Sequence, residues 1–285
     1  MKKVYFDTNV IDRVEGNWEA SEFESLLASQ GFMLSIGLHV MYELAKGFLK
    51  IRSEDKIKSL FKFLDQLNEP HFIPPTRDLI RGEIYKVQGK GILLQRMHDE
   101  NNRRTKEEVW RMANDSTDEA TRFVEGRENE IRSETPQLSE EIIRQINKLR
   151  STNPEYLKSI RNFVDFKNKL EEGDKLRILQ MELRSYRLKV LDLDLKRILI
   201  SQSDYPVINT WLNCNFYLNW IPARHQVQPG RDKLGDLRHV INCCASDLFV
   251  SDDEDLITLF PKLNPFKEHM SWNAFKSMLE GNNSI

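Results

Sequence analysis

The sequence predicts an α/β protein with a central parallel sheet, interrupted by a long and mostly helical segment. Over roughly the first 75 residues, short apolar runs alternate with amphipathic helical patterns. The same alternation returns near the C-terminus, while the segment between has almost no strand signal. Strands that alternate with helices favour a parallel sheet with helical crossovers, so we expect one sheet built from both ends of the chain.

The first expected strand is Val4–Phe6, because its β-branched and aromatic residues suit a buried strand. It ends abruptly at Asp7, Thr8 and Asn9, which are small polar residues that prefer turns and helix N-termini. The elements expected next are strands at 32–36 and 71–73, separated by amphipathic helices that include residues 40–48 and 55–67.

The middle of the chain is expected to be a helical insertion, residues 77–203, within a discontinuous α/β domain of residues 1–76 and 204–285. Its charge is uneven: residues 99–141 carry 13 acidic against 7 basic residues, and residues 142–197 carry 14 basic against 8 acidic. Two solvated faces that neutralise each other explain this pattern. A basic arm that holds a phosphate backbone, with Arg184, Arg187 and Lys189 among its charges, explains it as well.

Strand and helix patterns resume after the insertion. Residues 209–220 are rich in aromatic side chains and are expected to form a helix or a buried wall. Residues 234–244 read as a helix that bears Asp236 and His239, and residues 247–251 read as a strand. An acidic run, Asp252 to Asp255, follows that strand directly and leads into another helix.

Composition excludes several classes of protein. The 285 residues are 40% hydrophobic and 30% charged, which is typical of a globular domain rather than a disordered chain. The net charge of −2 argues against a uniformly basic nucleic-acid binder. Three cysteines without a C-x-x-C pair argue against a disulfide scaffold or a cysteine zinc site. No apolar run could span a bilayer or serve as a signal peptide, so we expect a cytoplasmic protein.

Four acidic residues lie beside expected strand ends or on inward helix faces: Asp7, Glu43, Asp236 and Asp253. Ligands bind at the carboxyl ends of strands in open α/β sheets, which is where Asp7 is expected. Carboxylates that share one cleft repel each other, and a divalent cation neutralises them. Hard oxygen ligands favour Mg²⁺ or Mn²⁺, so the sequence predicts a site for one of these ions.

Four short motifs resemble the PIN-domain nucleases, in the order found in that family. Asp7-Thr8-Asn9 follows the first strand, and Glu43-Leu44-x-x-Gly47 resembles the second acidic motif. The segment from Leu234 to Val240 resembles the D-x-x-H helix of the family, and the segment from Phe249 to Leu256 resembles its last strand-to-helix motif. The resemblance covers about the first and last 75 residues and leaves the insertion outside.

The resemblance implies a Rossmann-like sheet and a metal-dependent ribonuclease in which Mg²⁺ or Mn²⁺ activates water for phosphodiester hydrolysis. It implies that Asp7, Glu43, Asp236 and Asp253 are the catalytic metal ligands, with Asp255 as the second choice for the fourth. Thr8, Asn9 and Ser251 would orient carboxylates or water. Arg231, Lys233 and Arg238 could contact substrate phosphate. RNA is the expected substrate; single-stranded DNA and a dimeric state stay open.

Each of these residues also has a simpler interpretation. Asp7 and Asp236 could cap helices, and Glu43 could be a surface acid. The acidic run could lie at the N-terminus of a helix, where the helix dipole stabilises negative charge. His239 is expected to be a structural hydrogen-bonding group rather than a metal ligand. The alternative function is a PIN-like scaffold without catalysis, whose insertion binds RNA or a protein partner such as an antitoxin.

Overall fold

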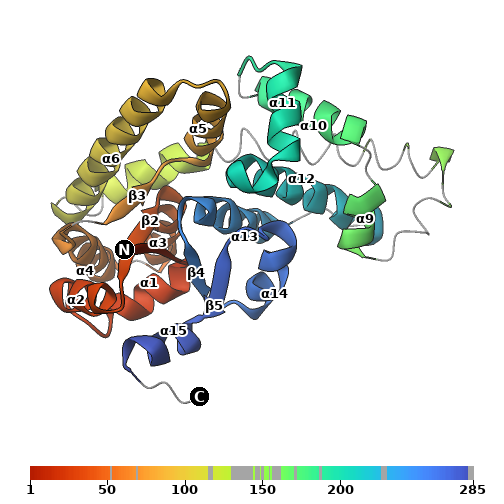
Figure 1. The fold of residues 1–285 in the computed structure, drawn as a ribbon. Coiled ribbons are helices and arrows are strands. Elements are labelled where there is room, and N and C mark those ends of the chain that lie inside the picture. The colour runs from red at the N-terminus through yellow and green to blue at the C-terminus, as the bar shows by residue number, and fades with distance from the viewer. Residues whose placement is uncertain are drawn as a thin grey trace.

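A computed structural model describes residues 1–51, 53–68, 70–114, 118–129, 144, 148, 151–153, 155, 162–169, 172–185, 188–225 and 230–281. At its centre lies a five-stranded sheet in which every pair of neighbouring strands is parallel, which confirms the predicted α/β class. Helices surround the sheet, and the two ends of the chain meet in it (Figure 1). Across the sheet the strands are β3 (His71–Ile73), β2 (Phe32–Gly37), β1 (Lys2–Phe6), β4 (Leu248–Ser251) and β5 (Glu268–Ser271).

The strand order 3-2-1-4-5 creates a reversal between β1 and β4. The chain places β2 and β3 on one side of β1, and β4 and β5 on the other side. Such a reversal leaves a crevice outside the carboxyl ends of the two central strands, which is the usual ligand site of open α/β sheets. Phe6 ends β1 and pairs with Val250 of β4, so both strands end at this crevice.

Successive residues of β1 point to opposite faces of the sheet and anchor a helical layer on each. Phe6 packs edge-on against Phe275, with ring centroids 5.3 Å apart, and it also contacts Phe23 and Trp272. Tyr5 stacks on Phe249 on the other face. The flanking helices are α1 (Thr8–Glu15), α2 (Ala20–Ser29), α3 (Leu38–Lys50), α4 (Glu54–Gln66), α13 (Arg231–Asn242), α14 (Glu254–Leu263) and α15 (Trp272–Leu279).

The described residues between β3 and β4 contain helices and no strand, as the sequence predicts. Besides α13, they include α5 (Thr76–Val87), α6 (Gly91–Asn114), α9 (Phe163–Lys169), α10 (Glu172–Ser185), α11 (Asp192–Ile200) and α12 (Pro206–His225). Helix α6 packs against α4 and β3, so part of the segment belongs to the same body as the sheet. The expected basic arm is described only in part: Arg184 and Lys189 are exposed, and Arg187 lies outside the described residues.

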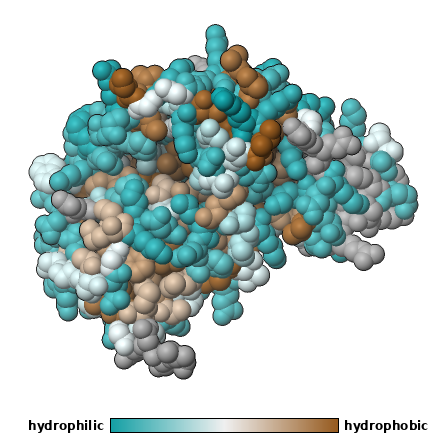
Figure 2. Space-filling model, viewed as in Figure 1, coloured by the Kyte–Doolittle hydropathy of each residue, from teal (hydrophilic) through white to brown (hydrophobic). Residues whose placement is uncertain are grey.

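Most side chains on the face shown in Figure 2 are hydrophilic, but several large apolar residues gather over α6 and α11. No helix within the described residues combines the length and apolar character needed to cross a membrane.

Glu83 ties α5 to the first turn of α12. Its buried carboxylate accepts hydrogen bonds from the backbone N–H groups of Val207 (2.8 Å) and Ile208 (2.7 Å). Burial outweighs these bonds and raises the pKa of Glu83 from 4.5 to about 7. The folded protein therefore holds a proton on Glu83 at pH values where the unfolded chain has lost it.

The burial of Glu83 makes the free energy of unfolding depend on pH. Stability from Glu83 is fully present below pH 4.5 and is lost as the pH rises through about 7, because only the folded state keeps the proton. The loss should reach about 3 kcal/mol across this window. Urea unfolding from pH 4.5 to 8 should show a flatter pH dependence for Glu83→Gln than for the wild type. Asp78→Asn on the same helix should keep the wild-type slope. If the free energies of unfolding of Glu83→Gln and the wild type changed with pH in parallel, the raised pKa of Glu83 would be contradicted.

Candidate functional site

The candidate site lies at the carboxyl ends of β1 and β4, where the strand order reverses. Asp7 follows β1 directly and is only 4% exposed. One oxygen of Asp7 accepts a hydrogen bond from the N–H of Val10 (2.9 Å) and caps α1. The other accepts from the hydroxyl of Ser251 at the end of β4 and from the N–H of Asp252 (3.3 Å). Asp7 is therefore a helix cap, and it also joins the two strands at the crevice.

The acidic run after β4 is arranged around Ser251 and α14. The N–H of Asp253 donates to Ser251 Oγ (3.0 Å), and the Asp253 carboxylate caps α14 through Leu256 N (2.9 Å). Asp252 forms an ion pair with Arg13 of α1. Asp255 lies in the first turn of α14 and is exposed. Asp253 is thus nearer than Asp255 to the Asp7–Ser251 contact along the chain of hydrogen bonds.

Glu43 stands at the centre of a second group of side chains, drawn from α1, α3 and α13. Thr8 donates its hydroxyl hydrogen to Oε2 of Glu43. Nε2 of His239 lies 2.9 Å from the same oxygen, and Nε2 of His39, one helical turn before Glu43, lies 3.2 Å from Oε1. Tyr5 Oη lies 2.9 Å from Nδ1 of His239 and extends the group into the core. The sequence prediction that His239 forms hydrogen bonds is confirmed.

The pKa values of Glu43, His39 and His239 depend on one another. Burial would raise the pKa of Glu43, but the hydrogen bond and charge of His239 outweigh it and lower that pKa well below its usual range. Burial would lower the pKa of His239, but its hydrogen bond to Glu43 raises the pKa instead. Burial dominates at His39 and lowers its pKa from 6.5 to about 4. Near neutral pH, Glu43 is ionised and His39 is neutral.

Asp236 lies on α13, one helical turn before His239, and it forms an ion pair with Lys233 (2.8 Å). This hydrogen bond raises the pKa of Lys233 against the effect of its partial burial. The side chain of Arg231 lies outside the described residues, and Arg238 is half-buried on the same helix. Of the three expected phosphate contacts, Lys233 is therefore placed next to a predicted metal ligand.

The predicted carboxylates lie near the carboxyl ends of the strands, but their oxygens do not form one tight cluster. In the described part of the chain, the one set of three potential metal-ligating atoms within 4.8 Å of one another belongs to His39, Glu43 and His239. Asp7, Asp236 and Asp253 each have hydrogen-bonding partners of their own. The predicted support residues differ too: Thr8 and Ser251 contact acids, and Asn9 is exposed.

His39 is a site residue that sequence reasoning missed. It follows β2 by two positions and lies four residues before Glu43, so the two side chains share one face of α3. That i,i+4 spacing was the available signal, but a single histidine on a mostly apolar helix is common in protein cores. Its partner His239 is separated from Glu43 by 196 positions, and only the fold brings them together.

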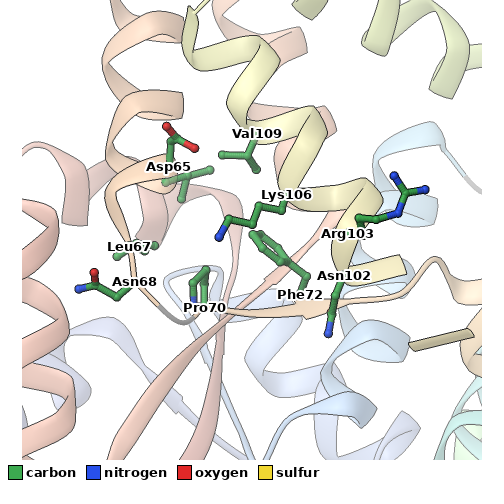
Figure 3. Close-up of a pocket in the computed structure, with 10 residues that line it drawn as sticks. Asp65, Leu67, Asn68, Pro70, Phe72, Asn102, Arg103, Lys106 and Val109 are labelled. Atoms are coloured by element: carbon green, nitrogen blue, oxygen red, sulfur yellow. The ribbon is translucent and has the colours of Figure 1, made fainter. Parts of the chain in front are cut away.

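A separate surface depression lies between α4, β3 and α6 (Figure 3). Phe72, Lys106, Arg103 and Asp65 are among the residues that line it. It borders β3, at the far edge of the sheet from β4, and contains none of the predicted site residues. The crevice at β1 and β4 therefore remains the candidate site.

Comparison with protein-family profiles, with curated proteins and with solved structures gave no match for this chain. Function must therefore be inferred from the side chains at the crevice.

Proposed function

We propose that this protein is a metal-dependent nuclease with a PIN-like catalytic domain, and that RNA is its substrate. One observation carries the proposal: a buried carboxylate, Asp7, stands at the switch point of the sheet and is held there by Ser251 of the neighbouring strand. Glu43 on α3 contacts Thr8 beside Asp7, and Asp253, the N-cap of α14, contacts Ser251. Asp236 lies on α13 with His239, which contacts Glu43. This is the place, and the type of residue, that the motif resemblance implies.

The side chains at the switch point suit a divalent cation. Among the described residues, the ion pairs nearby use Asp252, Asp236 and Glu43 and leave out Asp7, whose buried charge has only neutral hydrogen-bond donors. Asp7, Glu43, Asp236 and Asp253 would hold Mg²⁺ or Mn²⁺ through oxygen atoms. When bound, the ion would polarise the phosphodiester group and lower the pKa of a water molecule.

The surrounding residues have roles that do not depend on the ion. Ser251 and Val10 N–H fix the rotamer of Asp7, and Thr8 does the same for Glu43. Fixed carboxylates lose less freedom when a ligand arrives, so the site is already ordered for binding. Lys233 places a positive charge beside Asp236, where it can attract the phosphate backbone of a substrate.

A cleavage assay tests the proposal directly. Labelled single-stranded RNA, transfer RNA and single-stranded DNA would be incubated with tag-free protein in Mn²⁺, in Mg²⁺ or in EDTA. We expect cleavage of RNA with either ion and none in EDTA, with activity restored when Mn²⁺ is added in excess. Cleavage that persists in EDTA, or no cleavage of any substrate in either ion, would contradict a metal-dependent nuclease.

A binding scaffold is the second candidate, favoured by exposed apolar side chains in the helical segment. Trp110 on α6 is 57% exposed and Ile200 on α11 is 75% exposed. Large apolar side chains exposed to solvent can belong to interaction surfaces, and an antitoxin or another protein could cover either helix. In that case replacing Trp110 with Ser should weaken binding to a purified partner and leave RNA cleavage unchanged.

A further inference from the structure

The geometry points to a mixed nitrogen and oxygen site for a divalent transition metal, Zn²⁺ or Co²⁺, held by His39, Glu43 and His239. This inference stands apart from the nuclease proposal, although the two share Glu43. Two histidines and one carboxylate are a recurrent ligand set for catalytic zinc and for other first-row metals. The lack of a cysteine motif excludes only thiolate sites and says nothing against this one.

The spacing of the three side chains suits one ion. Nε2 of His39 and Oε1 of Glu43 are 3.2 Å apart, Nε2 of His239 and Oε2 of Glu43 are 2.9 Å apart, and the ligand atoms all lie within 4.8 Å. With bonds of 2.0–2.1 Å, two ligands of a tetrahedral zinc ion lie about 3.3 Å apart. The widest separation between donor atoms must therefore shorten by at most about 1.5 Å for one ion to bind all three side chains.

His39 has a buried ring whose nitrogen atoms form no well-aligned hydrogen bond. It is 4% exposed, and neither ring nitrogen has a hydrogen-bond partner within the described structure. Nε2 lies close to Glu43 without the alignment of a hydrogen bond. Ligands of one ion behave this way, because each points at the ion rather than at its neighbour. A buried imidazole without a hydrogen bond is otherwise unfavourable, and a bound metal would satisfy Nε2.

Tyr5 and Thr8 contact the proposed ligands in the way that outer-shell residues contact the ligands of a metal site. A metal on Nε2 of His239 would leave a hydrogen on Nδ1, which the hydroxyl oxygen of Tyr5 can accept at 2.9 Å. Burial raises the pKa of Tyr5 well above its usual value, so the hydroxyl stays neutral. The Thr8 hydroxyl orients Glu43. Partners of this kind fix the ring orientation and raise the basicity of metal ligands.

Gly235 provides space beside two of the donor atoms. A Cβ at this position would lie 2.9 Å from Oε1 of Glu43 and 3.5 Å from Nε2 of His39. Glycine is unfavourable inside a helix, and Gly235 lies inside α13. The residue therefore keeps room next to donor atoms that would otherwise be crowded, and three protein ligands leave at least one coordination position for solvent or substrate.

Metal binding to tag-free protein tests the inference. After EDTA treatment and its removal, Zn²⁺ binding would be measured by equilibrium dialysis, and the Co²⁺ form would be studied by visible and X-ray absorption. We expect one equivalent per chain and nitrogen ligands in the absorption data. His39→Gln and His239→Gln should each lower the affinity by about a hundredfold or more, which exceeds the usual effect of losing an outer-shell partner.

Two further variants separate ligation from folding. His98→Gln changes a histidine of α6 outside the site and should bind Zn²⁺ as the wild type does. Gly235→Ala removes no ligand, yet it should lower the affinity about tenfold by displacing Glu43. Wild-type protein with no saturable binding, an oxygen-only ligand shell, or unchanged affinity in both site-histidine variants would overturn the inference.

The same experiment distinguishes this inference from the nuclease proposal. Asp7→Asn should keep Zn²⁺ binding with nitrogen ligands, since Asp7 is not one of the three ligands. If wild-type protein binds Zn²⁺ in this way but cuts no RNA, the nuclease proposal fails alone. If it cuts RNA with Mg²⁺ but lacks nitrogen-ligated metal, the inference fails alone.

Discussion

Asp7→Asn should reduce RNA cleavage by about a hundredfold or more, the scale of a lost electrostatic contact at a reacting group. The side-chain oxygen of Asn can still accept from the N–H of Val10 and keep the cap of α1. Its amide can donate to Ser251 in place of accepting from it. The fold should therefore survive, while the negative charge at the switch point is lost. Initial rates on labelled RNA in Mn²⁺ and the thermal unfolding midpoint would be measured together.

Asp247→Asn is the matched control for this substitution. Asp247 precedes β4, whereas the candidate site follows it, and its carboxylate accepts a hydrogen bond from the N–H of Lys3 (2.7 Å). The chemical change is identical, but it occurs at the amino end of β4, whereas the candidate site lies at the carboxyl end. Asp247→Asn should cleave RNA at nearly the wild-type rate. Equal rates for wild-type and Asp7→Asn protein, both free of contaminating ribonuclease, would remove Asp7 from the mechanism.

Strands β1 to β4 were predictable because their sequences are short apolar runs with clear ends. β1 stops at Asp7, and β3 stops at two prolines, so pattern and termination agree. β5 was missed because Glu268, His269, Met270 and Ser271 have little preference for strands. It lies at the edge of the sheet and is largely half-buried, so pairing with β4 rather than its own composition makes it a strand.

The site was predictable where one local signal was enough, and not where several elements had to meet. Asp7 combines a strand end with a capping residue, and both properties are visible in the sequence. The partners that other helices supply are not visible there: His239 of α13 and Thr8 of α1 both contact Glu43 of α3. Both pairings depend on which face of a helix points inward. That direction is set by the packing of α13 against α3, two elements far apart in the chain.

Glu43→Gln should destabilise the metal-free protein most strongly in mildly acidic solution. The lowered pKa of Glu43 contributes stability above pH 4.5 that is lost as the pH falls through its folded value. The raised pKa of His239 contributes stability below pH 6.5 that is lost as the pH rises through its folded value. The ion pair therefore contributes most between these two limits. In that window the introduced glutamine would leave the buried imidazole of His239 without a counter-charge.

The expected loss at pH 5.5 is about 2–3 kcal/mol, somewhat below the cost of breaking a fully buried pair, because the Glu43 side chain is 31% exposed. At pH 9 the loss should be smaller, because the stability from the raised pKa of His239 falls as the pH rises. The glutamine side chain can also still form a hydrogen bond with His239. Urea unfolding in EDTA at the two pH values measures this difference. Glu268→Gln, a substitution at an exposed surface pair with Lys2, should change stability little at either pH. An equal loss at both pH values for Glu43→Gln would mean that Glu43 and His239 are joined by a neutral hydrogen bond rather than an ion pair.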